Sequence, residues 1–241
     1  MSIKWHQPAL VGLFAAVAVG MAIGYVIERF TIRPLASRSP LVRTTVTIGW
    51  LLVLQELAGI IWGKNAYHQA VKVVRLSRLF TAPGGAVVAT DQLLTVVVAI
   101  ALAAAVAFVL KTTSFGAQMR AVADDPPTAR LWGIEVNRVT SASWVIGSGM
   151  AAVAGVLLTP RLNFDQISLT VLVIEGLIAA VIGGLSSLPL AVVGAFVLGI
   201  AEEWPRAFIS TNPGLEKFIA VLVVIAVLAV RPPRALGERL A

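Results

Sequence analysis

Residues 119–139 read MRAVADDPPTARLWGIEVNRV, and this polar stretch lies between two long apolar runs. It holds three acids, three arginines and a double proline, whereas the runs at 92–110 and 139–158 carry no charged residue. A helix needs about twenty mostly apolar residues to cross the hydrocarbon core of a bilayer. The stretch therefore predicts two membrane-spanning helices joined by a polar loop at 111–138.

The composition also indicates an integral membrane protein. Of the 241 residues, 58% are hydrophobic and 13% are charged, whereas a soluble domain carries about 25% charged residues. The net charge of +7 comes from basic residues that lie mostly between the apolar runs, where cytoplasmic loops and lipid head groups favour them, so we expect no nucleic-acid partner. The chain has no cysteine, and His6 and His68 lie far apart. We therefore expect no metal site and no cofactor.

Seven apolar runs predict an all-α integral membrane fold with about seven transmembrane helices, so that residues 1–241 form a single transmembrane domain. The last two runs reach a membrane-spanning length only with flanking residues. The runs are 8–27, 44–62, 92–110, 139–158, 166–185, 188–201 and 218–230.

The Lys and Arg residues in the gaps predict the orientation, because cytoplasmic loops are enriched in them. Alternating gaps give a larger set (Arg29, Arg33, Arg38, Arg43, Lys111, Arg120, Arg130, Arg138, Arg231, Arg234 and Arg239) and a smaller one (Lys4, Lys64, Lys72, Arg75, Arg78, Arg161, Arg206 and Lys217). The larger set places the loop 111–138 and the tail 231–241 in the cytoplasm, the segment 63–91 outside and the N-terminus outside. Basic residues near helical spacing at 72, 75 and 78 predict an amphipathic piece within the external segment.

The opening stretch has the signals of one short helix. Asp is a favoured N-cap, proline is favoured at the first helical position, and Gly133 suits the left-handed residue after the helix end. Residues 126–132 would then form a helix about 10 Å long. Such a helix suits either a capped connector or a surface that docks a protein partner. A magnesium-dependent phosphotransferase would need more carboxylates than the Asp pair and nearby Glu135 supply.

Several ordered motifs resemble the permease subunits of branched-chain amino acid ABC importers. They are GAQMRAVADDPPTARLWGIEVNRV (116–139), IGSGMAAVAGVLL (146–158), AAVIGGLSSLPLAVVGAFVLGIAE (179–202), RPPRALG (231–237) and ERFTIRPLASRSPLVRTTVTIGWLLVLQ (28–55). The resemblance implies a multi-pass subunit of the bacterial inner membrane that is not itself an enzyme. Its implied partners are a second permease subunit, two cytoplasmic ATPase subunits and a periplasmic or lipid-anchored substrate-binding protein.

In that family the segment corresponding to the opening stretch docks the ATPase. The chain has no G-x-x-x-x-G-K-[ST] phosphate loop of its own, in agreement with an ATPase partner. Carried over, the resemblance assigns the docking contact to Arg120, Ala121, Asp124, Asp125, Ala129, Gly133 and Ile134.

The chain departs from the family pattern at three places. Residues 1–27 contain nothing like the family's Asn-Phe-Ala-His-Gly motif, so we expect the family's first hydrophobic segment to be missing. Many relatives carry a basic residue where this chain has Glu175, and they tend to have glycine where it has Leu190. These departures leave open an ABC permease for urea, amides or another small solute. A secondary transporter would favour internal repeats, which we do not find.

Polar residues inside spans are costly and are candidates for function. Gln55 and Glu56 in one span and Glu175 in another are candidate pathway residues, with a buried ion pair or hydrogen bond as the alternative. Two stripes of small residues at four-residue spacing predict close helix packing. The stripes are Gly147, Ala151 and Gly155, and Gly176, Ala180 and Gly184.

Overall fold

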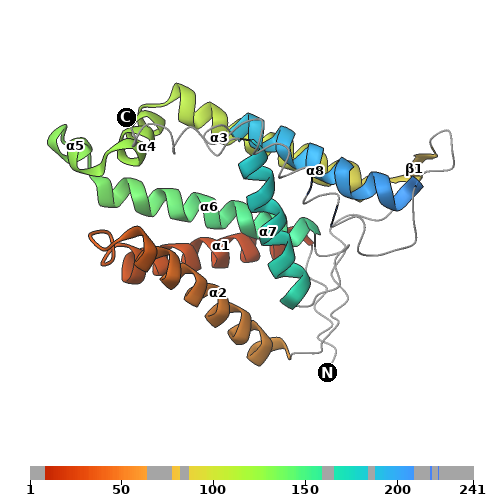
Figure 1. Cartoon of the computed structure of the whole chain (residues 1–241), viewed down its shortest axis with the longest axis horizontal. Coiled ribbons are helices and arrows are strands. Elements are labelled where there is room, and N and C mark those ends of the chain that lie inside the picture. The colour runs from red at the N-terminus through yellow and green to blue at the C-terminus, as the bar shows by residue number, and fades with distance from the viewer. Residues whose placement is uncertain are drawn as a thin grey trace. The chain divides into compact units, whose positions relative to one another are not determined.

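The computed structural model describes residues 9–63, 78–81, 87–158, 166–183 and 188–208, together with Phe218 and Leu222. Two compact units, Met1–Ser168 and Leu169–Ala241, are treated separately. The described elements are α1 (Ala9–Ile27), the π-helix η1 (Glu28–Ile32), α2 (Pro40–Trp62), β1 (Arg78–Thr81), β2 (Val87–Ala89), α3 (Thr90–Thr112), α4 (Ser114–Asp124), α5 (Pro126–Leu131), α6 (Val136–Leu158), α7 (Gln166–Ile182) and α8 (Leu188–Phe208) (Figure 1).

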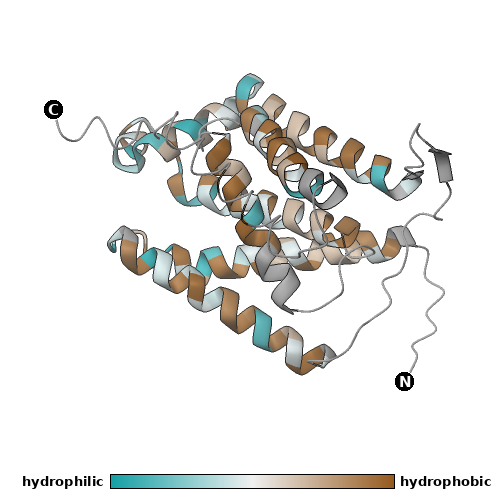
Figure 2. Ribbon diagram, turned by 45° about the vertical axis from the view of Figure 1, so that its right-hand side comes forward, coloured by the Kyte–Doolittle hydropathy of each residue, from teal (hydrophilic) through white to brown (hydrophobic). Residues whose placement is uncertain are grey.

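Four helical segments in the described residues are long and apolar enough to cross a membrane. They are Val11–Ile32, Leu41–Ile61, Gln92–Thr112 and Val136–Leu158, and Leu172–Ile182 is a shorter apolar helix. Apolar residues predominate in these helices (Figure 2), and many of their large apolar side chains are exposed, as lipid-facing helices require. The architecture thus agrees with an integral membrane permease. The number of seven spans stays a prediction, because most of the run 218–230 lies outside the described residues.

Local chemistry explains where α2 begins and ends. Pro40 occupies its first turn, where a missing N–H has no cost. At the other end Gly63 adopts φ of 86° and donates its N–H to the carbonyl of Gly59 at 2.9 Å. A positive φ favours glycine because it carries no Cβ, so Gly63 closes the helix.

The segment 63–91 contains a short β-ribbon, which the all-α prediction did not include. Strands β1 and β2 pair antiparallel, with Phe80 opposite Val88, Thr81 opposite Val87 and a register shift between Arg78 and Phe80. Aromatic and β-branched residues favour strands, and the Pro-Gly-Gly at 83–85 is typical of a turn. The predicted amphipathic piece lies mostly outside the described residues, and its last basic residue, Arg78, begins β1.

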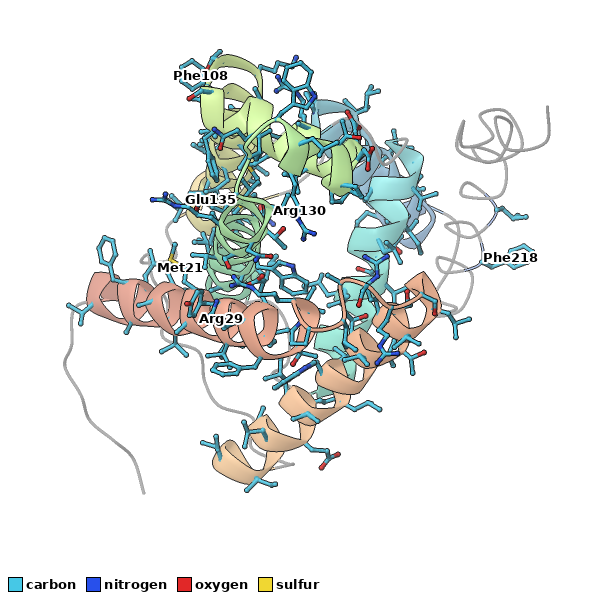
Figure 3. All side chains as sticks on the ribbon, turned by 90° about the vertical axis from the view of Figure 1, so that its left-hand side faces the viewer. Met21, Arg29, Phe108, Arg130, Glu135 and Phe218 are labelled. Atoms are coloured by element: carbon cyan, nitrogen blue, oxygen red, sulfur yellow. The ribbon has the colours of Figure 1, made fainter. Side chains whose placement is uncertain are left out.

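In the first unit, α1 and α6 lie side by side along their lengths (Figure 1). Close approach depends on glycines, since a Cβ at Gly20 would stand 2.7 Å from the Cβ of Ala152, and one at Gly24 would stand 2.6 Å from that of Ser148. Met21 points from α1 to α6 (Figure 3), and its Cγ lies 3.0 Å from where a Cβ at Gly149 would stand. Helix association in lipid depends on such packing.

The predicted stripe on α6 lies on another face of that helix. A Cβ at Gly147 or Gly155 would have nothing within 4 Å among the described atoms, and Ala151 is exposed. The residues of α6 that meet α1 are therefore not those of the stripe. A packing role for the stripe stays a prediction. It concerns the face of α6 that does not contact α1.

In the second unit, α7 and α8 pack through Ala179 and Leu198, which are both buried. A Cβ at Gly194 would stand 2.3 Å from the carbonyl oxygen of Ala179, and one at Gly183 would stand 2.4 Å from the Cα of Ala191. Glycine therefore permits this contact at both positions. Of the predicted stripe, Gly176 faces open space, Ala180 is half-buried and Gly184 lies outside the described residues.

Candidate functional site

The polar segment between α3 and α6 is the candidate docking site, and it contains two helices rather than one. The first, α4, begins at a corner that Thr113 caps. The hydroxyl of Thr113 accepts the N–H of Gly116 at 2.9 Å and donates to the carbonyl of Val109 at 2.6 Å. A Thr cap satisfies one of the free N–H groups at a helix start. This cap and the contact between α3 and α4 fix where the polar segment begins.

Gly116 makes the corner possible, and its replacement tests the corner. A Cβ at this position would stand 2.2 Å from the carbonyl oxygen of Val109 and 2.6 Å from the Cα of Leu110. We expect Gly116→Ala to destabilise the fold by about 1–3 kcal/mol, because backbone atoms cannot move aside as side chains do. The measurement is the thermal unfolding midpoint in detergent. Gly49→Ala is the control, since nothing lies within 4 Å of that position, and equal midpoints for the two variants would contradict the assignment.

The second helix, α5, begins as predicted, with Asp125 as N-cap and prolines at the first two positions. The detail of the cap differs from the prediction. The carboxylate of Asp125 accepts the hydroxyl of Thr128 rather than a backbone N–H. Proline has no N–H, so Pro126 and Pro127 leave fewer donors at this helix start for a cap to satisfy.

The end of α5 confirms the predicted role of Gly133. This residue has φ of 77°, its N–H bonds the carbonyl of Arg130 at 3.0 Å, and the N–H of Ile134 bonds the carbonyl of Ala129 at 3.1 Å. This pair of bonds is the Schellman motif, in which a glycine in the left-handed region closes a helix. The connection from α5 to α6 is therefore a defined turn.

The predicted docking residues differ in how far their side chains are exposed. Ala129 is only 3% exposed and Ile134 is half-buried, so both side chains pack within this chain. Ala121 is half-buried, whereas the other four are exposed, namely Arg120, Asp124, Asp125 and Gly133. The role of all seven at a partner surface stays a prediction.

The predicted set lacks two residues that the structure places on the outside of this segment. Leu131 is 88% exposed and Trp132 is 80% exposed, at the end of α5 and outside the four candidate spans. Apolar side chains that are exposed side by side outside the candidate spans are candidates for an interaction site. The available signal was the Leu-Trp pair just before the helix-ending glycine, in an otherwise polar stretch.

One pair of charged groups nearby makes a weak contact. Glu135 and Arg138 approach to 4.0 Å with side chains 76% and 84% exposed, and exposed pairs contribute about 0–1 kcal/mol. No group of three or more His, Cys, Asp or Glu that could hold a metal ion occurs in the part of the chain that the structure describes.

The candidate pathway residues lie in both units. Gln55 and Glu56 lie on α2, and Glu175 lies on α7. Gln55 and Glu175 are half-buried and Glu56 is exposed. Their role in a pathway stays a prediction.

Comparison with known proteins places these features in a family. The family described as branched-chain amino acid transport system / permease component matches residues 2–228. The permease protein LivH of the high-affinity branched-chain amino acid transport system of Escherichia coli is 31% identical over 94% of this chain and 74% of its own length. The corresponding protein BraD of Pseudomonas aeruginosa is 28% identical over 95% and 75%. The fructose import permease protein FrcC of Rhizobium meliloti is 26% identical over 93% and 63%. No solved structure matches the chain. Family match and relatives agree with the apolar helices, and the chain belongs to the branched-chain amino acid transport permease family.

Proposed function

We propose that this chain is the membrane-spanning permease subunit of an ATP-driven importer for branched-chain or related amino acids in the bacterial inner membrane. It forms the translocation pathway with a second permease subunit and is coupled to two cytoplasmic ATPase subunits, while a binding protein delivers the substrate. The names of the relatives in Escherichia coli and Pseudomonas aeruginosa support the substrate class. The fructose-named relative supports another small solute as the alternative.

The observation that carries the proposal is the exposed pair Leu131 and Trp132 at the end of α5. A few residues that become fully buried, among which Trp is enriched, supply most of the binding energy in protein interfaces. Helix α5 holds the pair in a defined position, because the helix has a cap at each end and its residue Ala129 is buried. We assign Leu131 and Trp132 as the anchors that enter the ATPase, with the exposed residues Arg120 and Asp124 at the polar rim.

The test is ATPase binding by a double variant. We expect Leu131→Ala/Trp132→Ala to weaken co-purification of the ATPase and ATPase-dependent uptake at least tenfold, since each lost anchor costs about 1–2 kcal/mol and 1.4 kcal/mol is tenfold. The measurements are co-purification from detergent and ATP-dependent solute uptake in proteoliposomes.

The matched control is Glu135→Ala/Arg138→Ala, which removes two exposed side chains from the same connection. We expect it to retain the ATPase. Equal retention by both double variants would exclude Leu131 and Trp132 as anchors, and uptake that proceeds without any ATPase would favour a secondary transporter.

A further inference from the structure

Among the described residues, Glu28 is the one charged side chain that is fully buried, with 0% exposure. It lies within the candidate span Val11–Ile32, at the junction of α1 and η1. A buried carboxylate is costly unless charges and hydrogen bonds compensate it, and ionisable residues inside membrane spans usually serve a function. The partners of Glu28 therefore indicate what this residue does.

The π-turn brings one partner to Glu28. In an α-helix, residues five apart point about 140° away from each other, since each residue adds about 100°. In η1 the N–H of Arg33 bonds the carbonyl of Glu28 at 2.8 Å, five residues earlier. The guanidinium of Arg33 then reaches both carboxylate oxygens, with Nε at 3.2 Å and Nη2 at 3.1 Å. Single π-turns of this kind occur frequently at functional sites.

The other partners come from the first turns of α6. The hydroxyl of Ser141 donates to Oε2 of Glu28 at 2.5 Å and accepts from Nη2 of Arg33 at 2.6 Å. The same nitrogen lies 3.3 Å from the carbonyl oxygen of Asn137, one turn earlier. Glu28, Arg33 and Ser141 form what we call the Glu28 cluster, which links the end of α1 to the start of α6.

The opposite side of α6 carries apolar contacts. Val136 and Val139 are 8% and 3% exposed, and at about 100° per residue their mean direction lies roughly 150° from that of Asn137 and Ser141. α6 also packs against α4 and α5, the two helices of the docking segment. The first turns of α6 thus join the docking segment to the Glu28 cluster.

We propose that the Glu28 cluster is a positioning device that transmits movement of the docking segment to α1 through the start of α6. This inference rests on the proposed function. When an ATPase displaces α5, α1 and η1 move with α6 because Ser141 donates a hydrogen bond to Glu28 and accepts one from Arg33. Glu28, Arg33 and Ser141 are positioning residues, and none of them needs to contact the ATPase or the solute.

The test removes the hydrogen bonds of Ser141 between the helices and keeps the ion pair, the contact of Arg33 with Asn137 and the packing of α1 on α6. Ser141→Ala deletes the hydroxyl that joins α6 to Glu28, while the contacts of Glu28 with Arg33, the residue after η1, remain. Ser143→Ala is the matched control, because the Ser143 hydroxyl bonds the carbonyl of Val139 within its own helix at 2.9 Å. Ser141→Thr restores a hydroxyl and serves as the rescue.

Two measurements are made on the complete importer in proteoliposomes: solute taken up per ATP hydrolysed, and hydrogen–deuterium exchange at 136–141. We expect Ser141→Ala to lower uptake per ATP at least threefold with an unchanged amount of bound ATPase, and to speed exchange at 136–141. Ser143→Ala and Ser141→Thr stay near the wild type in both. An unchanged amount of bound ATPase shows that the chain is still folded, so a lower ratio of uptake to hydrolysis at equal ATPase content separates positioning from stability.

Equal exchange in Ser141→Ala and Ser143→Ala would overturn the link itself. Faster exchange with an unchanged ratio of uptake to hydrolysis would overturn the transmission of movement and leave ATPase docking intact. If the wild-type chain binds no ATPase, the proposed function fails and the transmission fails with it, while the exchange comparison still decides whether the cluster holds the start of α6.

Discussion

Gly24→Leu is expected to separate α1 from α6 and to lower the free energy of unfolding by about 3 kcal/mol. A Cβ at Gly24 would stand 2.6 Å from the Cβ of Ser148 and 3.0 Å from the carbonyl oxygen of Trp144. Neither atom can rotate away, so the helices must move apart. Residue 28 follows residue 24 on the same face, one turn later, so we expect the separation to draw Glu28 away from Ser141 as well.

The measurement is the thermal midpoint of the purified chain in detergent, followed by size-exclusion chromatography after heating. Gly12→Leu is the control in the same helix, where nothing lies within 4 Å. Leucine has a higher helix propensity than glycine by up to about 1 kcal/mol, so this control should be neutral or slightly stabilising. A Gly24→Leu midpoint equal to that of Gly12→Leu would contradict the close packing of α1 on α6.

Sequence reasoning predicted the features of the docking segment that depend on neighbouring residues. Asp125 before two prolines and Gly133 after an apolar pair specify the ends of α5 through local backbone chemistry, and the structure contains both ends. Helix α4 was not predicted. Thr113 is a favourable N-cap for it, but the polar residues from 118 onward were interpreted as part of a loop. Its place depends on the contact with α3, which local patterns do not report.

The direction of side chains depended on tertiary packing. Ala129, Leu131 and Trp132 are all apolar, and the pattern of such a short helix does not indicate which of them faces inward. The structure buries Ala129 and exposes the other two. A similar limit applied to Glu28 and Arg33, since pairs on a helix are expected three or four residues apart and only a π-turn aligns a spacing of five.

The packing stripes illustrate the same limit in a membrane protein. Four-residue spacing of small residues indicates that a face can accept a close neighbour, and it does not say which neighbour. Helix α6 carries such residues on more than one face, and α1 occupies the face of Ser148 and Ala152 rather than that of Gly147 and Ala151. Apolar patterning identifies the spans because hydrophobicity is a property of each segment alone. The pairing of helices depends on two segments that are distant in the sequence, so a local pattern does not predict it.

Ala129→Glu is expected to disrupt the packing of α5 against the rest of the chain and to abolish coupling to the ATPase. Ala129 is 3% exposed, so an acid there is either buried without a partner, at a cost of roughly 3 kcal/mol or more, or turned outward with the loss of the turn. That turn includes the bond from the Ile134 N–H to the Ala129 carbonyl. Because Leu131 and Trp132 stand on this helix, their placement should be lost even though both side chains remain.

Thr128→Glu is the control at the neighbouring position, where the side chain is exposed. It removes the exposed hydroxyl that donates to Asp125, and the favourable position of an acid near the helix start offsets part of that loss. Hydrogen–deuterium exchange and limited proteolysis at 126–134 report the detachment, and ATP-dependent uptake reports the coupling. We expect faster exchange, cleavage within the segment and at least tenfold lower uptake for Ala129→Glu, with Thr128→Glu near the wild type. Faster exchange with unchanged uptake would mean that a rigid α5 is not needed for docking, since the anchors then bind equally well from a loosened segment.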